Sequence, residues 1–118
     1  PSKKEQANAK PLNTPMMAWF VKHVVKSEAD TQDPRLNLVA SNLKGLPPTT
    51  VINAEIDPLK SDGDLIVAKL KEAGVETTHH LYTGVTHEFF GMDAVVAKAR
   101  EAQDFAVAQI RKGFEARK

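Results

Sequence analysis

A strand, a helix and a second strand follow one another closely after residue 48, and few folds accommodate that order. The run Thr49–Ala54 is β-branched and apolar, as in a buried strand, and Pro58 follows its end. Apolar spacing predicts a helix over residues 62–73, alternation predicts a strand over 75–82, and a further apolar stripe predicts a helix over 92–114. Two strands joined by one helix form a right-handed βαβ unit. We therefore expect an α/β fold with parallel strands and flanking helices.

The helix over residues 62–73 begins with a capping signal. Ser61 is expected to cap its first turn, and Asp64, three residues later, completes a capping box. A serine in that position binds backbone N–H groups, so Ser61 is interpreted as a structural residue and not as a nucleophile.

The start of the chain is less regular. Residues 1–12 are polar and show no apolar period, so we expect them to form a mobile lead-in. Asn13, followed by Pro15, predicts the beginning of a short amphipathic helix over residues 15–26.

Composition and connection lengths indicate a single domain. The chain has 118 residues, of which 42% are hydrophobic and 26% are charged, as in an ordinary globular domain with one core. Prolines and asparagines interrupt the periodic patterns before residue 49. We expect a helix and a long loop over residues 13–48, and the strand–helix–strand–helix unit over 49–118.

The charge balance and the absence of cysteine exclude several functions. Sixteen lysines and arginines against 15 aspartates and glutamates give a net charge of +1, which argues against nucleic acid as a partner. Without cysteine there are no disulfides, thiolate metal sites or cysteine nucleophiles. No apolar run reaches the roughly 18 residues of a membrane span, and no signal peptide is evident. A cytoplasmic protein is expected.

Two residues lie where a βαβ unit places its ligands. Asp57 follows the first predicted strand, and His87 follows the second. Because the loops after parallel strands emerge at one edge of the sheet, the two side chains can meet. A carboxylate that accepts the Nδ1 proton of a histidine prepares its Nε2 atom to act as a general base. The alternative is structural, with Asp57 as a turn former before Pro58 and His87 as a capping or surface residue.

The other histidines form no recognisable metal motif. His79 and His80 are neighbours on a predicted strand and should point to opposite faces, and no H-E-x-x-H spacing occurs. Glycine-rich phosphate loops are also absent from the sequence. We therefore expect neither a metal ion nor an organic cofactor.

Three segments, in order, resemble one known family. They are Leu46–Leu59 (LPPTTVINAEIDPL), Leu70–Val75 (LKEAGV) and Tyr82–Phe90 (YTGVTHEFF). Together they resemble the C-terminal part of the hormone-sensitive-lipase-like branch of the α/β-hydrolases, with its GLPP, D-P-L, AGV and H-x-F-F patterns. Met17–Phe20 is more weakly similar to a helix of the cap-side insertion in that family.

This resemblance implies a function and residue roles. Asp57 matches the acid of the family's catalytic triad and His87 its base, in enzymes that hydrolyse small carboxylic esters without metal or cofactor. The family's Gly-x-Ser-x-Gly nucleophile motif and His-Gly-Gly oxyanion loop do not occur in the chain. Glu88 stands where many members have glycine, and we expect its side chain to point to solvent.

The missing nucleophile suggests that residues 1–118 are the C-terminal portion of one longer α/β-hydrolase domain, with an incomplete sheet. The first residue, Pro1, is not an initiator methionine, which agrees with this interpretation. Such a segment should be inactive alone. Its open strand edges predict self-association, as a homodimer through a strand edge or the last helix, and the resemblance also implies dimers. The alternative function is a non-catalytic ligand-binding or interaction module on a hydrolase scaffold.

Overall fold

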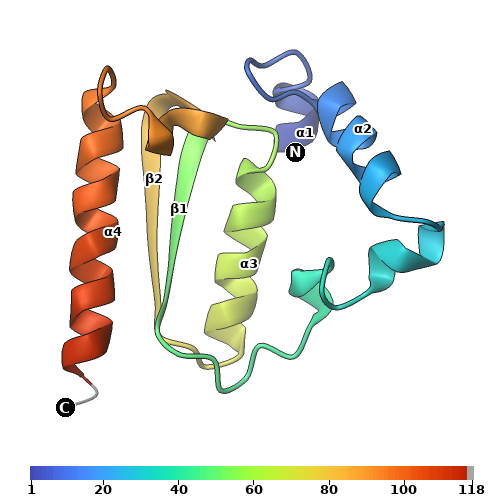
Figure 1. Cartoon of the computed structure of the whole chain (residues 1–118). Helices are drawn as coiled ribbons and strands as arrows, with labels where there is room; N and C mark the ends of the chain where they lie inside the picture. Colours follow the sequence, from blue (N-terminus) through green and yellow to red (C-terminus); the bar gives the residue numbers. More distant parts are fainter. Residues whose placement is uncertain (117–118) are drawn as a thin grey trace.

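The computed structural model describes residues 1–116 and contains a two-stranded parallel sheet between helices. Strand β1 (Thr49–Ile56) pairs with strand β2 (Thr77–Thr86). Helix α3 (Lys60–Glu72) connects the strands and covers one face of the sheet, and helix α4 (Ala97–Glu115) covers the other (Figure 1). The expected α/β class with parallel strands and flanking helices is confirmed, and the short sheet agrees with the expected incomplete one.

Alternating side chains on the strands divide the core into two clusters, one on each face of the sheet. The cluster beside α4 contains Ala54, Tyr82, Val85, Phe89, Ala99 and Ala102. The cluster beside α3 contains Leu43, Leu70 and Val75. Both faces are therefore covered, as is usual for a parallel sheet.

Strand β2 is longer than expected. It ends at Thr86 instead of residue 82, because Gly84 interrupts the regular pairing of the strand without ending it. His87 consequently follows the strand directly and begins the short 3₁₀ helix η3 (His87–Gly91). Helix α4 starts only at Ala97, after η3 and a turn.

The helix expected near residue 15 is present. Helix α2 (Thr14–Val24) begins where the Asn13 side chain accepts a hydrogen bond from the Met16 N–H group. The long connection that follows contains two 3₁₀ helices, η1 (Glu28–Gln32) and η2 (Leu38–Ala40). It descends on the side of α3 that faces away from the sheet (Figure 1). Within residues 1–116, no helix is long and apolar enough to cross a lipid bilayer.

The expectation of a mobile lead-in over residues 1–12 is wrong. Ser2–Glu5 form a short helix, α1, and Leu12 is buried. Ser2 is only 3% exposed. A serine buried through hydrogen bonds produces no apolar pattern, so the sequence contains no sign that this segment joins the fold.

Ser61 does not cap α3, which corrects a second expectation. The helix begins at Lys60, so Ser61 lies inside the first turn, and no neighbouring side chain caps it. The Ser61 N–H group instead donates to the Ser2 hydroxyl, at 3.0 Å. Asp64 binds Lys60 and Asn53 and completes no capping box. A residue distant in sequence has therefore taken the role that the local motif suggested.

Helix α3 lies very close to β1 at Gly63. A Cβ atom at that position would lie 2.7 Å from Nδ2 and 2.8 Å from Cγ of Asn53, and closer still to Oδ1. Asn53 is buried, and its amide donates to the Lys60 carbonyl, so it cannot swing away without losing that bond. Glycine at 63 is required by this close approach.

Replacement of Gly63 should therefore destabilise the fold. We expect Gly63→Ala to lower the free energy of unfolding by about 1–3 kcal/mol through overpacking. Gly113→Ala is the control, because a Cβ atom added there, in helix α4, would meet no neighbouring atom within 4 Å, and it should be neutral or stabilising by up to about 1 kcal/mol. Urea unfolding followed by circular dichroism measures both. Equal effects of the two variants would contradict the close approach.

Candidate active site

Asp57 and His87 lie side by side at the carboxyl ends of the two strands. Asp57 follows β1 and His87 follows β2, so the parallel pairing brings the two positions to the same edge of the sheet. The His87 Nδ1 atom lies 2.8 Å from the Asp57 Oδ2 atom, a hydrogen bond between groups 30 residues apart. The contact that the strand order predicts is therefore present.

The Asp57 carboxylate is held on both sides. Its Oδ1 atom accepts the Leu59 N–H at 2.8 Å, while Oδ2 contacts His87. The Asp57 side chain is 10% exposed, whereas that of His87 is 36% exposed. The buried carboxylate is thus fixed in place by a hydrogen bond at each oxygen, and the imidazole beside it remains accessible from solvent.

This arrangement has a definite chemical capacity. With Oδ2 as acceptor, the neutral imidazole carries its proton on Nδ1, and Nε2 is left with a free lone pair. Such a nitrogen can accept a proton from a nucleophile, and the aspartate stabilises the imidazolium that forms. The pair can therefore perform general base and general acid catalysis.

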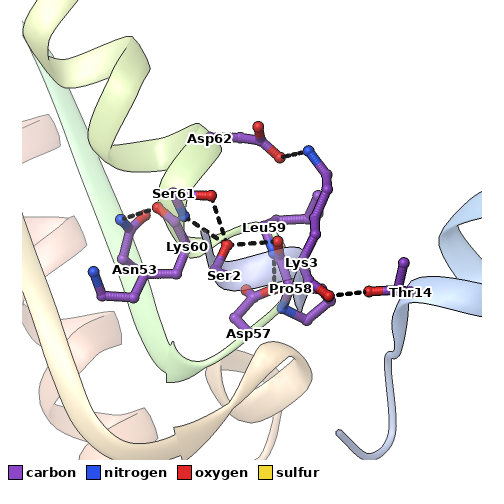
Figure 2. A network of polar contacts seen from close by, with 10 residues as sticks. All are labelled: Ser2, Lys3, Thr14, Asn53, Asp57, Pro58, Leu59, Lys60, Ser61 and Asp62. Carbon is purple, nitrogen blue, oxygen red and sulfur yellow. Dashed lines mark hydrogen bonds and ion pairs between the residues drawn. The ribbon is translucent and has the colours of Figure 1, made fainter. Parts of the chain in front are cut away.

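A second set of contacts supports the turn that holds Asp57, and it starts from Ser2. The Ser2 hydroxyl donates to the Pro58 carbonyl at 2.7 Å and accepts the Ser61 N–H at 3.0 Å (Figure 2). The Ser61 hydroxyl oxygen lies 2.7 Å from the Ser2 hydroxyl oxygen. Lys3 adds an ion pair with Asp62 at 2.6 Å. Sequence reasoning missed this support, because no local motif links residues so far apart in the chain.

The segment that follows His87 packs into the apolar cluster beside α4. Phe89, which follows His87 in η3, is buried against Tyr82 with ring centroids 5.4 Å apart. Burial raises the pKa of the Tyr82 phenol, and the nearby Glu101 adds to that effect. Glu88 is exposed, in agreement with the expected solvent-facing side chain. The packing of Phe89 fixes the backbone directly after His87.

The remaining histidines lie apart from the pair. His79 lies on the α3 side of the sheet, 3.9 Å from Asp64, whereas His80 stacks on Tyr82 and contacts Phe105 on the α4 side. Asp64 also accepts a hydrogen bond from Lys60, which raises the pKa of that ammonium group. Among residues 1–116, no cluster of three or more potential ligands is placed to hold a metal ion.

No serine of the described segment is placed as a nucleophile. Ser2 and Ser61 bind each other and the backbone. Ser27 caps η1, and the Ser41 hydroxyl donates to backbone carbonyls of the long connection. Within residues 1–116, His87 has a hydrogen bond to Asp57 and none to a serine hydroxyl.

Comparisons with known proteins identify the family of the chain. Residues 1–91 match the family described as alpha/beta hydrolase fold. An ethyl acetate hydrolase of Pseudomonas putida is 32% identical over 91 residues, and the hormone-sensitive lipase of Mus musculus is 30% identical over 71 residues. A solved hyperthermophilic esterase from the archaeon Pyrobaculum calidifontis matches 94% of the chain with a TM-score of 0.90 and 32% identity. The chain belongs to the α/β-hydrolase family, in the branch that includes hormone-sensitive lipase.

The matched region is a minor part of each relative. The alignments cover 76% of this chain and 29% of the ethyl acetate hydrolase, and 60% of this chain and 9% of the lipase. The structural match covers 37% of the archaeal esterase. The chain therefore spans less than two fifths of the length of each of these proteins.

The buried hydroxyl of Ser2 should matter more to stability than that of Ser61. Ser2→Ala leaves the Pro58 carbonyl and the Ser61 N–H without their partner, so we expect a loss of about 1–3 kcal/mol in the free energy of unfolding. Ser61→Ala removes one hydroxyl contact and keeps the backbone bond to Ser2, so its loss should be smaller. Chemical denaturation of both variants measures the difference. An effect of Ser2→Ala no larger than that of Ser61→Ala would refute this anchoring.

Proposed function

We propose that Asp57 and His87 are the acid and the base of a Ser-His-Asp triad that hydrolyses carboxylic esters. The observation on which the proposal depends is the 2.8 Å contact between His87 Nδ1 and Asp57 Oδ2 at the carboxyl edge of a parallel sheet. The relatives add the reaction class, since their names are those of esterases, a lipase and an ethyl acetate hydrolase. A small carboxylic ester is therefore the proposed substrate, and no cofactor is required.

The nucleophile in this proposal is a serine outside residues 1–118, in a longer polypeptide of which this chain is the C-terminal portion. His87 Nε2 takes the serine hydroxyl proton while the serine oxygen attacks the ester carbonyl carbon. The tetrahedral intermediate expels the alcohol, which takes the proton from His87, and an acyl-enzyme remains. Water, deprotonated by the same nitrogen, then releases the carboxylic acid and regenerates the serine. Asp57 keeps the His87 ring in its orientation and stabilises the imidazolium in both halves of the reaction, acylation and deacylation.

The first test uses the coding sequence upstream of Pro1. If it contains a Gly-x-Ser-x-Gly motif, the extended protein should cleave a chromogenic short-chain ester, and His87→Ala should lower kcat by a factor of about 10⁴ or more. Asp57→Asn should also cause a large loss, because an amide favours the wrong tautomer of His87. His23→Ala is the matched control and should retain activity, since His23 lies on α2 against Trp19.

The isolated chain provides a second, complementary test of the proposal. Residues 1–118 alone should show no turnover, since they contain the base and acid without the nucleophile motif. Ester cleavage by this chain that is abolished by His87→Ala would overturn the proposal. An extended native protein with no nucleophile motif and no turnover would favour the alternative, a ligand-binding module on the same scaffold.

We further propose that the isolated chain self-associates as a homodimer through a strand edge or through α4. In the described sheet β1 and β2 pair only with each other, so each leaves one edge open. Helix α4 exposes Ile110 at 59% and Phe114 at 67%. These two side chains line a cavity of about 520 Å³ beside the amino ends of the strands, away from His87. A second copy of the chain would cover these apolar surfaces.

Light scattering at increasing protein concentration tests the dimer. We expect a mass above that of the monomer, and we expect Ile110→Asp to reduce it if α4 forms the interface, because a buried carboxylate is costly. Arg111→Asp adds the same group at an exposed neighbouring position and should have a smaller effect. A dimer that survives Ile110→Asp indicates the strand edge instead. A folded and strictly monomeric chain at high concentration excludes both.

A further inference from the structure

The pairing of the two strands changes just before the candidate active site. Thr49 through Ala54 pair with Thr77 through Tyr82, residue for residue. Ile56 then pairs with Thr86, so that Glu55 alone faces Thr83–Val85. Two additional residues of β2 are accommodated at this point, which makes it a β-bulge.

The side chains show the same irregularity. In an unbroken strand, Tyr82 and Val85 would point to opposite faces of the sheet. Both belong to the buried cluster beside α4. The bulge therefore reorients the last part of β2, from Val85 onward.

The bulge also determines which residue lies opposite Asp57. Had the pairing continued residue for residue, Val85 would occupy that position. With the two additional residues accommodated, His87 follows Thr86 and reaches Asp57, at 2.8 Å. The triad contact thus depends on the register shift as well as on the order of the strands.

Three groups hold the bulge in place. Gly84 has a φ of 69°, a left-handed conformation that glycine adopts at low cost. Its N–H group, which cannot join the regular ladder there, donates to the Glu55 Oε2 atom at 2.6 Å. The Lys98 ammonium group donates to the Thr83 carbonyl at 2.7 Å. A hydrogen bond from a backbone N–H to a carboxylate is among the stronger hydrogen bonds of proteins.

We propose that Glu55 is a positioning residue: by binding the Gly84 N–H it keeps the bulge of β2 in the conformation that places His87 against Asp57. Within residues 1–116, no hydrogen bond joins Glu55 to either of the two side chains, and Glu55 acts through the backbone of Thr83–Thr86. The role rests on the proposed function for its catalytic meaning, while its structural effect, the orientation of the His87 ring, can be measured without turnover.

The experiment measures the tautomer of the His87 ring in the 118-residue chain by ¹⁵N NMR in mildly alkaline buffer. The bond to Asp57 should favour the Nδ1–H tautomer by about tenfold or more. Glu55→Ala should reduce that ratio at least about fivefold, because the bulge loses its acceptor. Glu55→Gln keeps a carbonyl oxygen of equal reach and should retain most of the ratio. Glu76→Ala is the control: Glu76 is exposed and forms an ion pair with Lys112, away from the bulge, so its loss should change nothing.

Circular dichroism of each variant establishes that the fold is retained. If Glu55→Ala does not fold, Glu55→Asp replaces it, because the aspartate side chain is one methylene shorter and should not reach the Gly84 N–H group. An unchanged tautomer ratio in a folded Glu55→Ala or Glu55→Asp variant would overturn the proposal, as would an equal loss in Glu55→Gln. The two proposals separate cleanly. If the ratio falls as expected but the extended protein hydrolyses no ester, the positioning role stands and the esterase function fails.

Discussion

The Asp57 carboxylate joins the parts of this fold on which the site depends. One oxygen accepts the Leu59 N–H at the start of α3, and the other contacts His87 after β2. Pro58, which follows, is fully buried, and its carbonyl accepts the Ser2 hydroxyl of α1. Hydrogen bonds to a charged group contribute about 1.5–3 kcal/mol each, so this one turn fixes the relative positions of β1, α3, β2 and α1. The placement of His87 is thus coupled to elements that are distant in sequence.

The two members of the pair need opposite environments, and the fold supplies both. A carboxylate that orients a histidine must be immobile, and Asp57 is immobile because it is buried and bonded on both oxygens. In the proposed mechanism the histidine must also reach a nucleophile and a substrate, and the His87 side chain is about a third exposed. Phe89, two residues after His87, is buried. Its packing restrains the backbone that carries the exposed imidazole ring.

Sequence reasoning predicted the features that depend on the periodic spacing of apolar residues and on the order of strands and helices along the chain. The β-branched run before Asp57, the apolar stripe of α3 and the Asn13 cap are local signals, and the structure contains all three elements. Features that depend on distant contacts were missed. Ser61 looks like a cap in the sequence, but Ser2 supplies the hydroxyl that binds its N–H group. In the sequence, residues 1–12 have the character of a mobile segment, because the contacts that hold them are polar and produce no periodic pattern of apolar residues.

The β2 bulge lies between these two cases. Gly84 lies two residues beyond position 82, where the alternation of side chains in the sequence ends. A glycine there is compatible with a loop after the strand as well as with a bulge inside it. Strand order alone requires only that some residue after β2 face some residue after β1. The register decides which residue that is, and here the register depends on Glu55, Gly84 and Lys98, which lie on three different elements or segments. A motif with aspartate and histidine in the right order therefore predicts that the pair can meet, but the bulge determines that these two residues do.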